Sequence, residues 1–244
     1  AQFVVMFVMM VGVFRSKKEE NVLKGIRLFE PFSKEELGNI CKIGGPTAIQ
    51  GMVYCMISMV LTRMVAAFGA EAIATQRVGG QIESVSWNTA DGFAAALNAF
   101  VGQNYGAKKM DRVQKGYRIS FWTVAIWGAL IMLAFIIFPG PIAGVFFHEE
   151  KAMEIAISYL IIIGFSEAFM CVELMTIGAL SGLGKTKLCS VISITATSMR
   201  IPLAMVLSRT SLGLDGIWWA LTLTSVAKGI IFYLTFRYQM REKC

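Results

Sequence analysis

Positive charge is distributed very unevenly among the segments that separate the long apolar stretches of this chain. If the apolar stretches are laid out as alternating membrane crossings, one set of connecting segments holds seventeen Lys and Arg residues and the opposite set holds two. The basic set is residues 15–42, 104–118, 184–188 and 237–244, and the opposite set is residues 67–72, 139–153 and 208–216. Lys and Arg concentrate in the cytoplasmic loops of membrane proteins. The pattern therefore predicts a multi-pass, all-α membrane protein whose basic segments, including the C-terminus, are cytoplasmic.

The composition agrees with a membrane protein. The chain is 56% hydrophobic, its mean hydropathy is +0.62, and 16% of its residues are charged, against about 25% in soluble domains. A net charge of +7 can indicate nucleic-acid binding. Here, however, no basic segment is interleaved with stacking aromatic residues. Because most basic residues lie in the predicted cytoplasmic loops, we expect them to set topology and contact membrane lipid, and we expect no nucleic-acid partner.

The apolar stretches predict six crossings within residues 43–236. Their limits are about Ile43–Ala67, Ala72–Gln103, Ile119–Phe138, Ile155–Leu180, Leu188–Leu207 and Ile217–Phe236. In the second, Gly79, Gly80 and Gly92 are expected bend points, and Pro139 and Pro141 are expected to close the third and open an outer loop at residues 139–153.

The flanking segments predict a larger protein. Residues 15–42 are expected to be a cytoplasmic linker, in which a capping box of Ser33 and Glu36 predicts a helix that begins at Lys34. Residues 237–244 are expected to be a cytoplasmic tail. Residues 1–14 are apolar, but as a helix they would be only about 21 Å long, too short to span a bilayer. We therefore expect them to be the end of a preceding transmembrane helix.

Ionisable residues inside the predicted crossings are the main functional candidates. The eight are Arg63, Arg77, Glu83, Asp91, Glu167, Glu173, Arg200 and Lys228. A charge at the centre of a transmembrane helix costs about 2.5–3.5 kcal/mol, so such residues usually face a cavity or the interior of a bundle. Glu83 and Glu167 are expected near mid-depth, whereas Asp91 is nearer a helix end. Glu173 is six residues beyond Glu167 and is expected on another face.

The eight residues comprise four acids and four bases, which leaves two interpretations open. Some acids could bind a proton or a metal cation, and some could simply neutralise a neighbouring base. Features typical of enzymes are incomplete. Residues 179–186, ALSGLGKT, lack the strand that precedes a phosphate-binding loop, and His148-Glu149 lacks the second His of a zinc-protease helix. We therefore expect no enzyme activity, no cofactor and no resident metal.

Several motifs resemble one family. Residues 81–108, QIESVSWNTADGFAAALNAFVGQNYGAK, resemble the eighth helix and following loop of the multidrug and toxic compound extrusion (MATE) transporters. Residues 178–186, GALSGLGKT, and 200–204, RIPLA, resemble the region of the tenth and eleventh helices, and residues 44–47, GGPT, resemble the start of the seventh. The resemblance extends over nearly the whole chain.

The resemblance implies an architecture and an activity. Family members have twelve transmembrane helices in two six-helix lobes, so this chain would be the C-terminal lobe and its partner the N-terminal lobe. They export small organic compounds, often cationic, by alternating access driven by inward movement of Na⁺ or H⁺. The implied location is the plasma membrane, in bacteria the inner membrane. Alternatives left open are a lipid-linked oligosaccharide flippase of the same superfamily and a non-transporting structural membrane subunit.

The resemblance also implies a site. The substrate cavity would lie between the two lobes, bordered in this chain by the first, second and fourth crossings. Glu83 and either Glu167 or Glu173 would bind the coupling ion, with a transported Na⁺ near Glu83 or Glu167, and Arg200 would tune them. Tyr54, Trp87 and Asp91 complete the candidate substrate- and ion-binding residues. Tyr54 stands where sodium-coupled members often carry a Glu, so the choice between Na⁺ and H⁺ stays open.

Overall fold

The computed structural model describes residues 7–8, 11 and 34–241. The chain divides into two units, Ala1–Cys41 and Lys42–Cys244, and the helical bundle with its cavities belongs to the second unit. Most of the predicted helix end at residues 1–14, most of the predicted linker and the last three residues of the predicted tail lie outside the described residues. Ser33 also lies outside them, but helix α2 begins at Lys34, as its capping pattern predicts.

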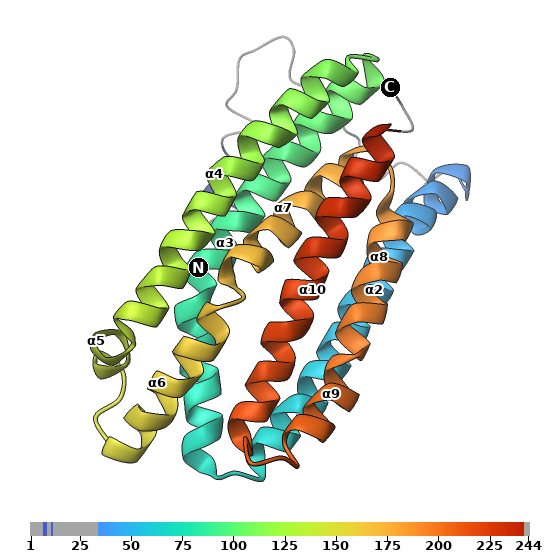
Figure 1. Ribbon diagram of the computed structural model, residues 1–244. Coiled ribbons are helices and arrows are strands. Elements are labelled where there is room, and N and C mark those ends of the chain that lie inside the picture. Colours follow the sequence, from blue (N-terminus) through green and yellow to red (C-terminus); the bar gives the residue numbers. More distant parts are fainter. Residues whose placement is uncertain (1–6, 9–10, 12–33, 242–244) are drawn as a thin grey trace. The chain divides into compact units, whose positions relative to one another are not determined.

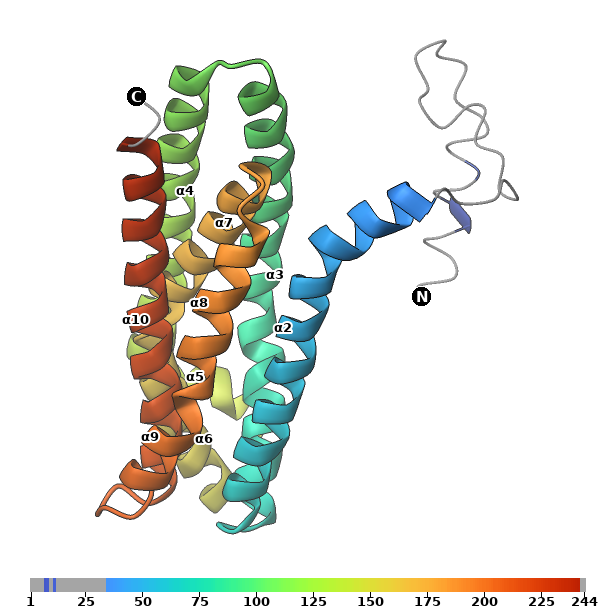
Figure 2. The same cartoon turned by 90° about the vertical axis from the view of Figure 1, so that its right-hand side faces the viewer.

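Every element of the described chain is a helix, and no strand occurs among these residues. The helices are α2 (Lys34–Ala66), α3 (Ala70–Gly106), α4 (Met110–Ile137), α5 (Pro139–Gly144), α6 (Glu150–Gly164), α7 (Glu167–Gly182), α8 (Thr186–Ser198), α9 (Arg200–Leu207) and α10 (Leu214–Arg241). The long helices run alternately up and down, with α6 and α7 following one direction and α8 and α9 the next (Figures 1 and 2). The all-α prediction is therefore confirmed.

Most of the predicted crossings satisfy a length and hydropathy criterion for membrane spans. Four segments of the described chain do so alone: Gly44–Ala66, Met110–Ile137, Thr186–Leu207 and Leu214–Arg241. Helices α6 and α7 together make a fifth, bent by 50°. Helix α3 is longer, with 37 residues, but is not among them, and it carries Glu83, Asn88 and Asp91. It runs beside α4 along the bundle (Figure 2), so the six predicted crossings correspond to six successive passes.

Two crossings that were predicted as single helices are interrupted, which corrects the prediction. The fourth ends at Gly164 and resumes at Glu167, with the Ser166 hydroxyl donating to the Ile163 carbonyl at 2.9 Å. The fifth is interrupted at Met199, between α8 and α9. Pro202 has no N–H to donate to the carbonyl four residues earlier, at the end of α8, which weakens the helix there.

Prolines elsewhere also act differently from the prediction. Residues 139–153, predicted as a loop, contain the short helix α5, which Pro139 opens because its fixed φ suits a first helical turn. Helix α3 continues as one helix through Gly79, Gly80 and Gly92, and bending at these glycines stays a prediction.

Helix α7 is the centre of the bundle and contacts α3, α4, α10 and α8. It approaches α3 closely through Gly178 and Gly182. A Cβ atom at Gly182 would lie 2.6 Å from the Asn98 carbonyl oxygen, and one at Gly178 would overlap the backbone of Ala94. Small residues four apart allow such close packing of membrane helices, where van der Waals contact drives association. Around this contact lies a core of buried residues from α3, α4, α7, α8 and α10.

Within residues 42–241, the connecting segments of the two sets lie at opposite ends of the bundle (Figures 1 and 2). The α3–α4 and α7–α8 connections and the last turns of α10 share the basic end. The α2–α3 turn, α5 and the α9–α10 loop share the other end, where Lys151 forms an ion pair with Glu71 at 3.4 Å. The asymmetry of charge along the sequence is thus an asymmetry between the two ends of the molecule.

Candidate functional site

A cavity of about 470 Å³ is bordered by seven helices of the bundle. Its lining residues come from α2, α3, the α6–α7 pair, α8, α9 and α10. The family resemblance implied a substrate cavity between two lobes, bordered by the first, second and fourth crossings, and the cavity within this chain also has lining residues from the fifth and sixth. The fifth and sixth crossings contribute because Arg200 and Lys228 turn their charges inward, where polar groups can solvate them.

Helix α3 presents one continuous face to the cavity. Its lining residues are Gln76, Gly80, Glu83, Trp87 and Asp91, which are three or four positions apart and so share a side of the helix. Trp87 is 41% exposed, and Asp91 is exposed as well. The structure therefore brings three of the predicted site residues, Glu83, Trp87 and Asp91, into one stripe along the cavity wall.

Glu83 is held in place by Tyr159 of α6. The hydroxyl of Tyr159 donates a hydrogen bond to Oε1 of Glu83. The ring of Tyr159 can reach this position because it lies over Gly79, one turn before Glu83, where any Cβ atom would overlap it. Trp218 of α10 packs against the same ring edge to face, with centroids 5.0 Å apart. Arg200 is close enough to Glu83 to attract its carboxylate.

Glu167 lies behind the cavity wall and is not among the lining residues. It is fully buried at the start of α7. Neither of its carboxylate oxygens has a hydrogen-bond partner within the described part of the chain. Glu83 and Ser86 are close enough to affect its charge, and Ser86 also shares a 3.2 Å hydrogen bond with Cys171. The two acids predicted near mid-depth are thus close enough to influence each other, and both also influence Tyr159.

Glu173 has a different role from Glu167, as their six-residue separation predicts. It lines the cavity and accepts a 2.7 Å hydrogen bond from the ammonium of Lys228, forming an ion pair in which both side chains are buried. The equal number of acids and bases left two interpretations open, and Glu173 follows the second of them, in which an acid neutralises a neighbouring base.

Arg200 begins α9 and is anchored by hydroxyl groups of α10. Its Nε donates to Oγ1 of Thr224 at 3.1 Å, and its Nη2 donates to Oγ of Ser225 at 2.9 Å. Because hydroxyl groups are neutral, these two hydrogen bonds do not neutralise the positive charge of Arg200. The charge therefore attracts the carboxylate of Glu83 and repels the ammonium of Lys228 at longer range.

The remaining candidates divide between the cavity and the surface. Tyr54 of α2 lines the cavity and is exposed, whereas Arg63 and Arg77 are exposed and do not line it.

Three residues that contact the charged side chains of the site were not predicted from the sequence, namely Tyr159, Thr224 and Ser225. A usable signal existed for α10, where Leu221, Ser225 and Lys228 recur at helical spacing. Tyr159 lies in an apolar stretch, and nothing in its sequence surroundings indicated a contact with Glu83.

Metal ligation by a preformed cluster is not a feature of this site. Within the residues that the structure describes, no group of three or more His, Cys, Asp or Glu side chains is arranged to hold a metal ion. Pairs of carboxylates and hydroxyls, such as those around Glu83 and Glu167, remain as the polar groups that an ion could meet.

A family model described as MatE matches residues 46–206, about two thirds of the chain. The chain belongs to the MatE family. The resemblance predicted from the motifs is thereby confirmed. Members of this family are transporters and not enzymes, which agrees with the incomplete enzyme-like motifs. Membrane-spanning helices and bacterial relatives together indicate a multi-pass membrane protein.

Relatives extend the comparison beyond the matched region. The chain is 28% identical over 211 residues to a probable multidrug resistance protein NorM of Thermotoga maritima, covering 83% of this chain and 45% of that protein. It is 24% identical to a probable multidrug resistance protein YoeA of Bacillus subtilis, covering 97% and 51%. The fold matches a crystal structure of MATE in the straight conformation, with a TM-score of 0.85, 20% identity, and coverage of 98% and 54%. This MatE chain therefore spans about half the length of the curated relatives it matches.

Proposed function

We propose that this MatE chain forms the C-terminal lobe of an exporter of small organic compounds, and that an N-terminal six-helix lobe completes the transport pathway. The relatives are named as multidrug resistance proteins, and the chain matches about half of each. In transporters built from two repeats, substrate sites lie at the interface of the repeats and rocking of one against the other gives alternating access. We expect the cavity of this lobe to be one wall of that site.

The observation that carries the proposal is the composition of the cavity wall. It combines Glu83, Asp91 and Glu173 with Arg200 and Lys228. Since Glu173 and Lys228 neutralise each other and Arg200 faces Glu83, the carboxylate of Asp91 is the acid left over. It lies one turn from the exposed ring of Trp87, and an aromatic face beside a carboxylate attracts an organic cation. This wall favours a cationic or neutral substrate.

Coupling to an ion is assigned to Glu83 and Glu167. A buried carboxylate without a partner is so costly in its bare charged form that it takes up a proton or a cation. Glu167 is in this situation, and Glu83 connects it to the cavity through their shared neighbour Tyr159. Uptake of H⁺ or Na⁺ by Glu83 and Glu167 would make the electrostatic potential at the cavity wall less negative. Arg200 would compete with the coupling ion for Glu83.

The alternatives fit the wall less well. A lipid-linked oligosaccharide flippase would move a large anionic head group, which requires a surplus of basic residues, whereas here three acids meet two bases. A structural subunit would gain nothing from keeping five ionisable residues around one cavity at a cost of several kcal/mol.

Dye export tests the proposal. Cells that lack their own exporters and express the full-length protein should accumulate less ethidium than cells with an empty vector. Cells that express only the present chain should accumulate as much as the control, because a site between two lobes needs both. A protonophore and a sodium ionophore, applied separately, identify the coupling ion by which of them abolishes export. Equal dye accumulation with the full-length protein and the vector would contradict the proposal.

Orientation is part of the proposal and has its own test. We expect the basic end of the bundle, with Lys109, in the cytoplasm and the opposite end, with Glu150, outside. In a cysteine-free background, Glu150→Cys should react with a membrane-impermeant maleimide in intact cells. Lys109→Cys should react only after the membrane is opened. The reverse pattern of labelling would show that the assigned orientation is wrong.

A further inference from the structure

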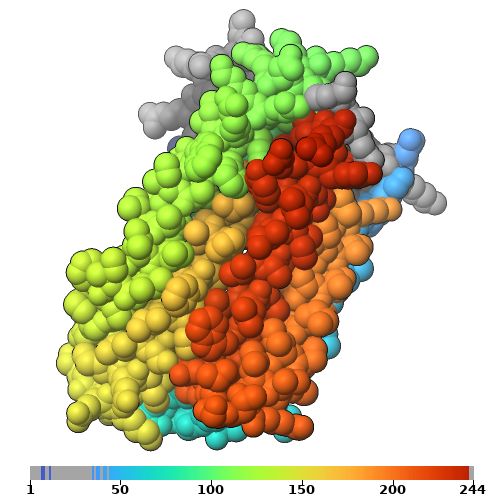
Figure 3. Space-filling model, in the orientation of Figure 1, coloured from blue at the N-terminus to red at the C-terminus, as the bar shows by residue number. Residues whose placement is uncertain are grey.

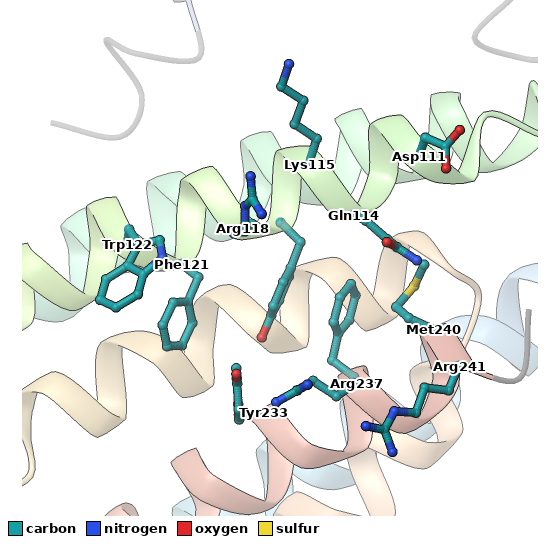
Figure 4. A pocket seen from close by; sticks show the side chains of 12 residues that line it. Asp111, Gln114, Lys115, Arg118, Phe121, Trp122, Tyr233, Arg237, Met240 and Arg241 are labelled. Carbon is teal, nitrogen blue, oxygen red and sulfur yellow. The ribbon is translucent and has the colours of Figure 1, made fainter. Parts of the chain in front are cut away.

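A second hollow lies at the basic end of the bundle, between α4 and α10 (Figure 4). It has a volume of about 750 Å³ and shares no lining residue with the cavity described above. Figure 3 shows the face of the molecule on which α4 (green) and α10 (red) approach each other at one end, with α6 and α7 (yellow) between them along the rest of that face. We call this hollow the α4–α10 crevice, and the proposed transport cycle assigns it no role.

The crevice carries a strong excess of positive charge. Lys115 and Arg118 of α4 and Arg237 and Arg241 of α10 line it, with Asp111 as the single acid. All four basic side chains are exposed, and none forms an ion pair with an acid in the described part of the chain. In Figure 4 Lys115 extends away from α10, whereas Arg237 lies beside Tyr233, with its Cζ atom 5.8 Å from the ring centroid. The crevice is therefore a positive opening in which four basic residues meet one acid.

The floor of the crevice is aromatic and rigid. Tyr117 stacks on Phe236 with ring centroids 3.6 Å apart, and its hydroxyl bonds Thr176 of α7 at 2.9 Å. Phe121 lies 5.1 Å from Tyr233, so aromatic residues bridge the two helices. Such a floor is preformed, because packing and a buried hydrogen bond fix its side chains.

One side of the crevice continues onto the apolar surface of α4. Trp122 lines the crevice and is 61% exposed, and beyond it Ile126, Leu130 and Leu133 are exposed at helical spacing. In a membrane this surface faces the acyl chains, and Trp side chains gather at the boundary between acyl chains and head groups. The basic crevice is thus continuous with an apolar track, which is the exposed apolar surface of α4 beyond Trp122. This arrangement matches a phospholipid, whose charged head group is continuous with its acyl chains.

We infer that the α4–α10 crevice binds an anionic phospholipid, with the phosphate of the head group among Arg118, Arg237 and Arg241 and an acyl chain along Trp122. Basic pockets between transmembrane helices bind anionic head groups. Free phosphate shares the charge of the head group but has no acyl chain to occupy the apolar track. A lipid in this position holds α4 and α10 together at the end of the bundle where the floor residues meet.

Native mass spectrometry of the full-length protein with dioleoyl phosphatidylglycerol, compared with dioleoyl phosphatidylcholine, tests the inference. We expect retained phosphatidylglycerol on the wild type and little phosphatidylcholine. The double variant Arg118→Gln/Arg237→Gln removes one cation from each helix and should bind phosphatidylglycerol about 30-fold more weakly, since each basic residue at an anionic surface contributes roughly a factor of five. The matched control Lys108→Gln/Lys109→Gln removes two exposed cations of the same end outside the crevice and should bind as the wild type does.

Three results would overturn the inference: equal retention of both lipids, equal loss in the control variant, or displacement of phosphatidylglycerol by millimolar inorganic phosphate. A second measurement tests the inference if the double variant Arg118→Gln/Arg237→Gln folds poorly. Brominated phosphatidylglycerol should quench tryptophan fluorescence more than brominated phosphatidylcholine does, and Trp122→Phe should abolish that difference. A difference that persists in Trp122→Phe would place the lipid elsewhere. Both measurements are independent of transport, so they separate failure of this inference from failure of the proposed function.

Discussion

Replacing Glu83 by Gln is expected to abolish ion-driven export while leaving the protein folded. The amide oxygen of Gln can still accept the hydrogen bond from Tyr159, so the packing of that ring over Gly79 is retained. What the substitution removes is the charge that a proton or Na⁺ would neutralise. Coupling between two ligands of a transporter amounts to about 1–3 kcal/mol, so we expect ethidium efflux to fall by about tenfold or more.

The matched substitution for this prediction is Asp91→Asn. Asp91 lies two turns along the same face of α3, lines the same cavity and is exposed, so water can solvate it. We expect Asp91→Asn to weaken binding of a cationic dye but to keep its dependence on the ion gradient. Efflux, expression level and thermal stability are measured together. If Glu83→Gln is poorly folded, Glu83 serves to neutralise Arg200, and if Glu83→Gln exports normally, neither role stands.

Removing one partner of the buried Glu173–Lys228 ion pair is expected to destabilise the protein strongly. Lys228→Met leaves the carboxylate of Glu173 buried without its 2.7 Å partner. Breaking such a pair typically costs about 3–5 kcal/mol, whereas replacing both members by apolar residues is often neutral. The single variants Lys228→Met and Glu173→Leu should therefore unfold at clearly lower temperatures, and the double variant should recover most of the loss.

Thermal unfolding of the full-length protein in detergent measures this effect. The exposed pair of Lys151 and Glu71 provides the control, because it is also an ion pair but lies at the surface, at the end of the bundle opposite the basic end. Lys151→Met should change the unfolding temperature little. A double variant of the buried pair that is no more stable than the single variants would mean that the charges themselves, and not their pairing, maintain the cavity wall.

Much of the architecture could be predicted from patterns that act along the chain. Lengths of apolar sequence fix the six passes, and the distribution of Lys and Arg fixes which connections share an end. The stripe of Glu83, Trp87 and Asp91 could also be predicted, because the spacing of residues on a helix determines its faces. Likewise, the six-residue separation of Glu167 and Glu173 placed them on different faces, one behind the cavity wall and one lining it.

Features that depend on contacts between distant segments could not be predicted in this way. The partner of Glu173 is 55 residues away, and the hydroxyls that hold Arg200 belong to the next pass of the chain. The helix interruption before Glu167 also depends on a contact between distant segments. Gly164 packs against Phe135 of α4 there, and a Cβ atom at Gly164 would lie 3.0 Å from the Phe135 side chain. Tyr159 gained its role only because Gly79 of another helix leaves room for its ring.

The proposed coupling of an ion to the substrate cavity through Glu83 can be measured as a linkage between ion binding and drug binding. Ethidium affinity of the purified full-length protein is measured by fluorescence polarisation, first across pH at fixed Na⁺ and then across Na⁺ at fixed pH. Linkage requires that an ion exchanged against the drug weakens drug binding. We expect the ethidium affinity to fall by about 5- to 150-fold as the concentration of one of the two ions increases, and we expect Glu83→Gln to lose this dependence while Asp91→Asn keeps it. An ethidium affinity that responds to neither ion, or responds equally in Glu83→Gln, would show that Glu83 does not couple ion binding to drug binding.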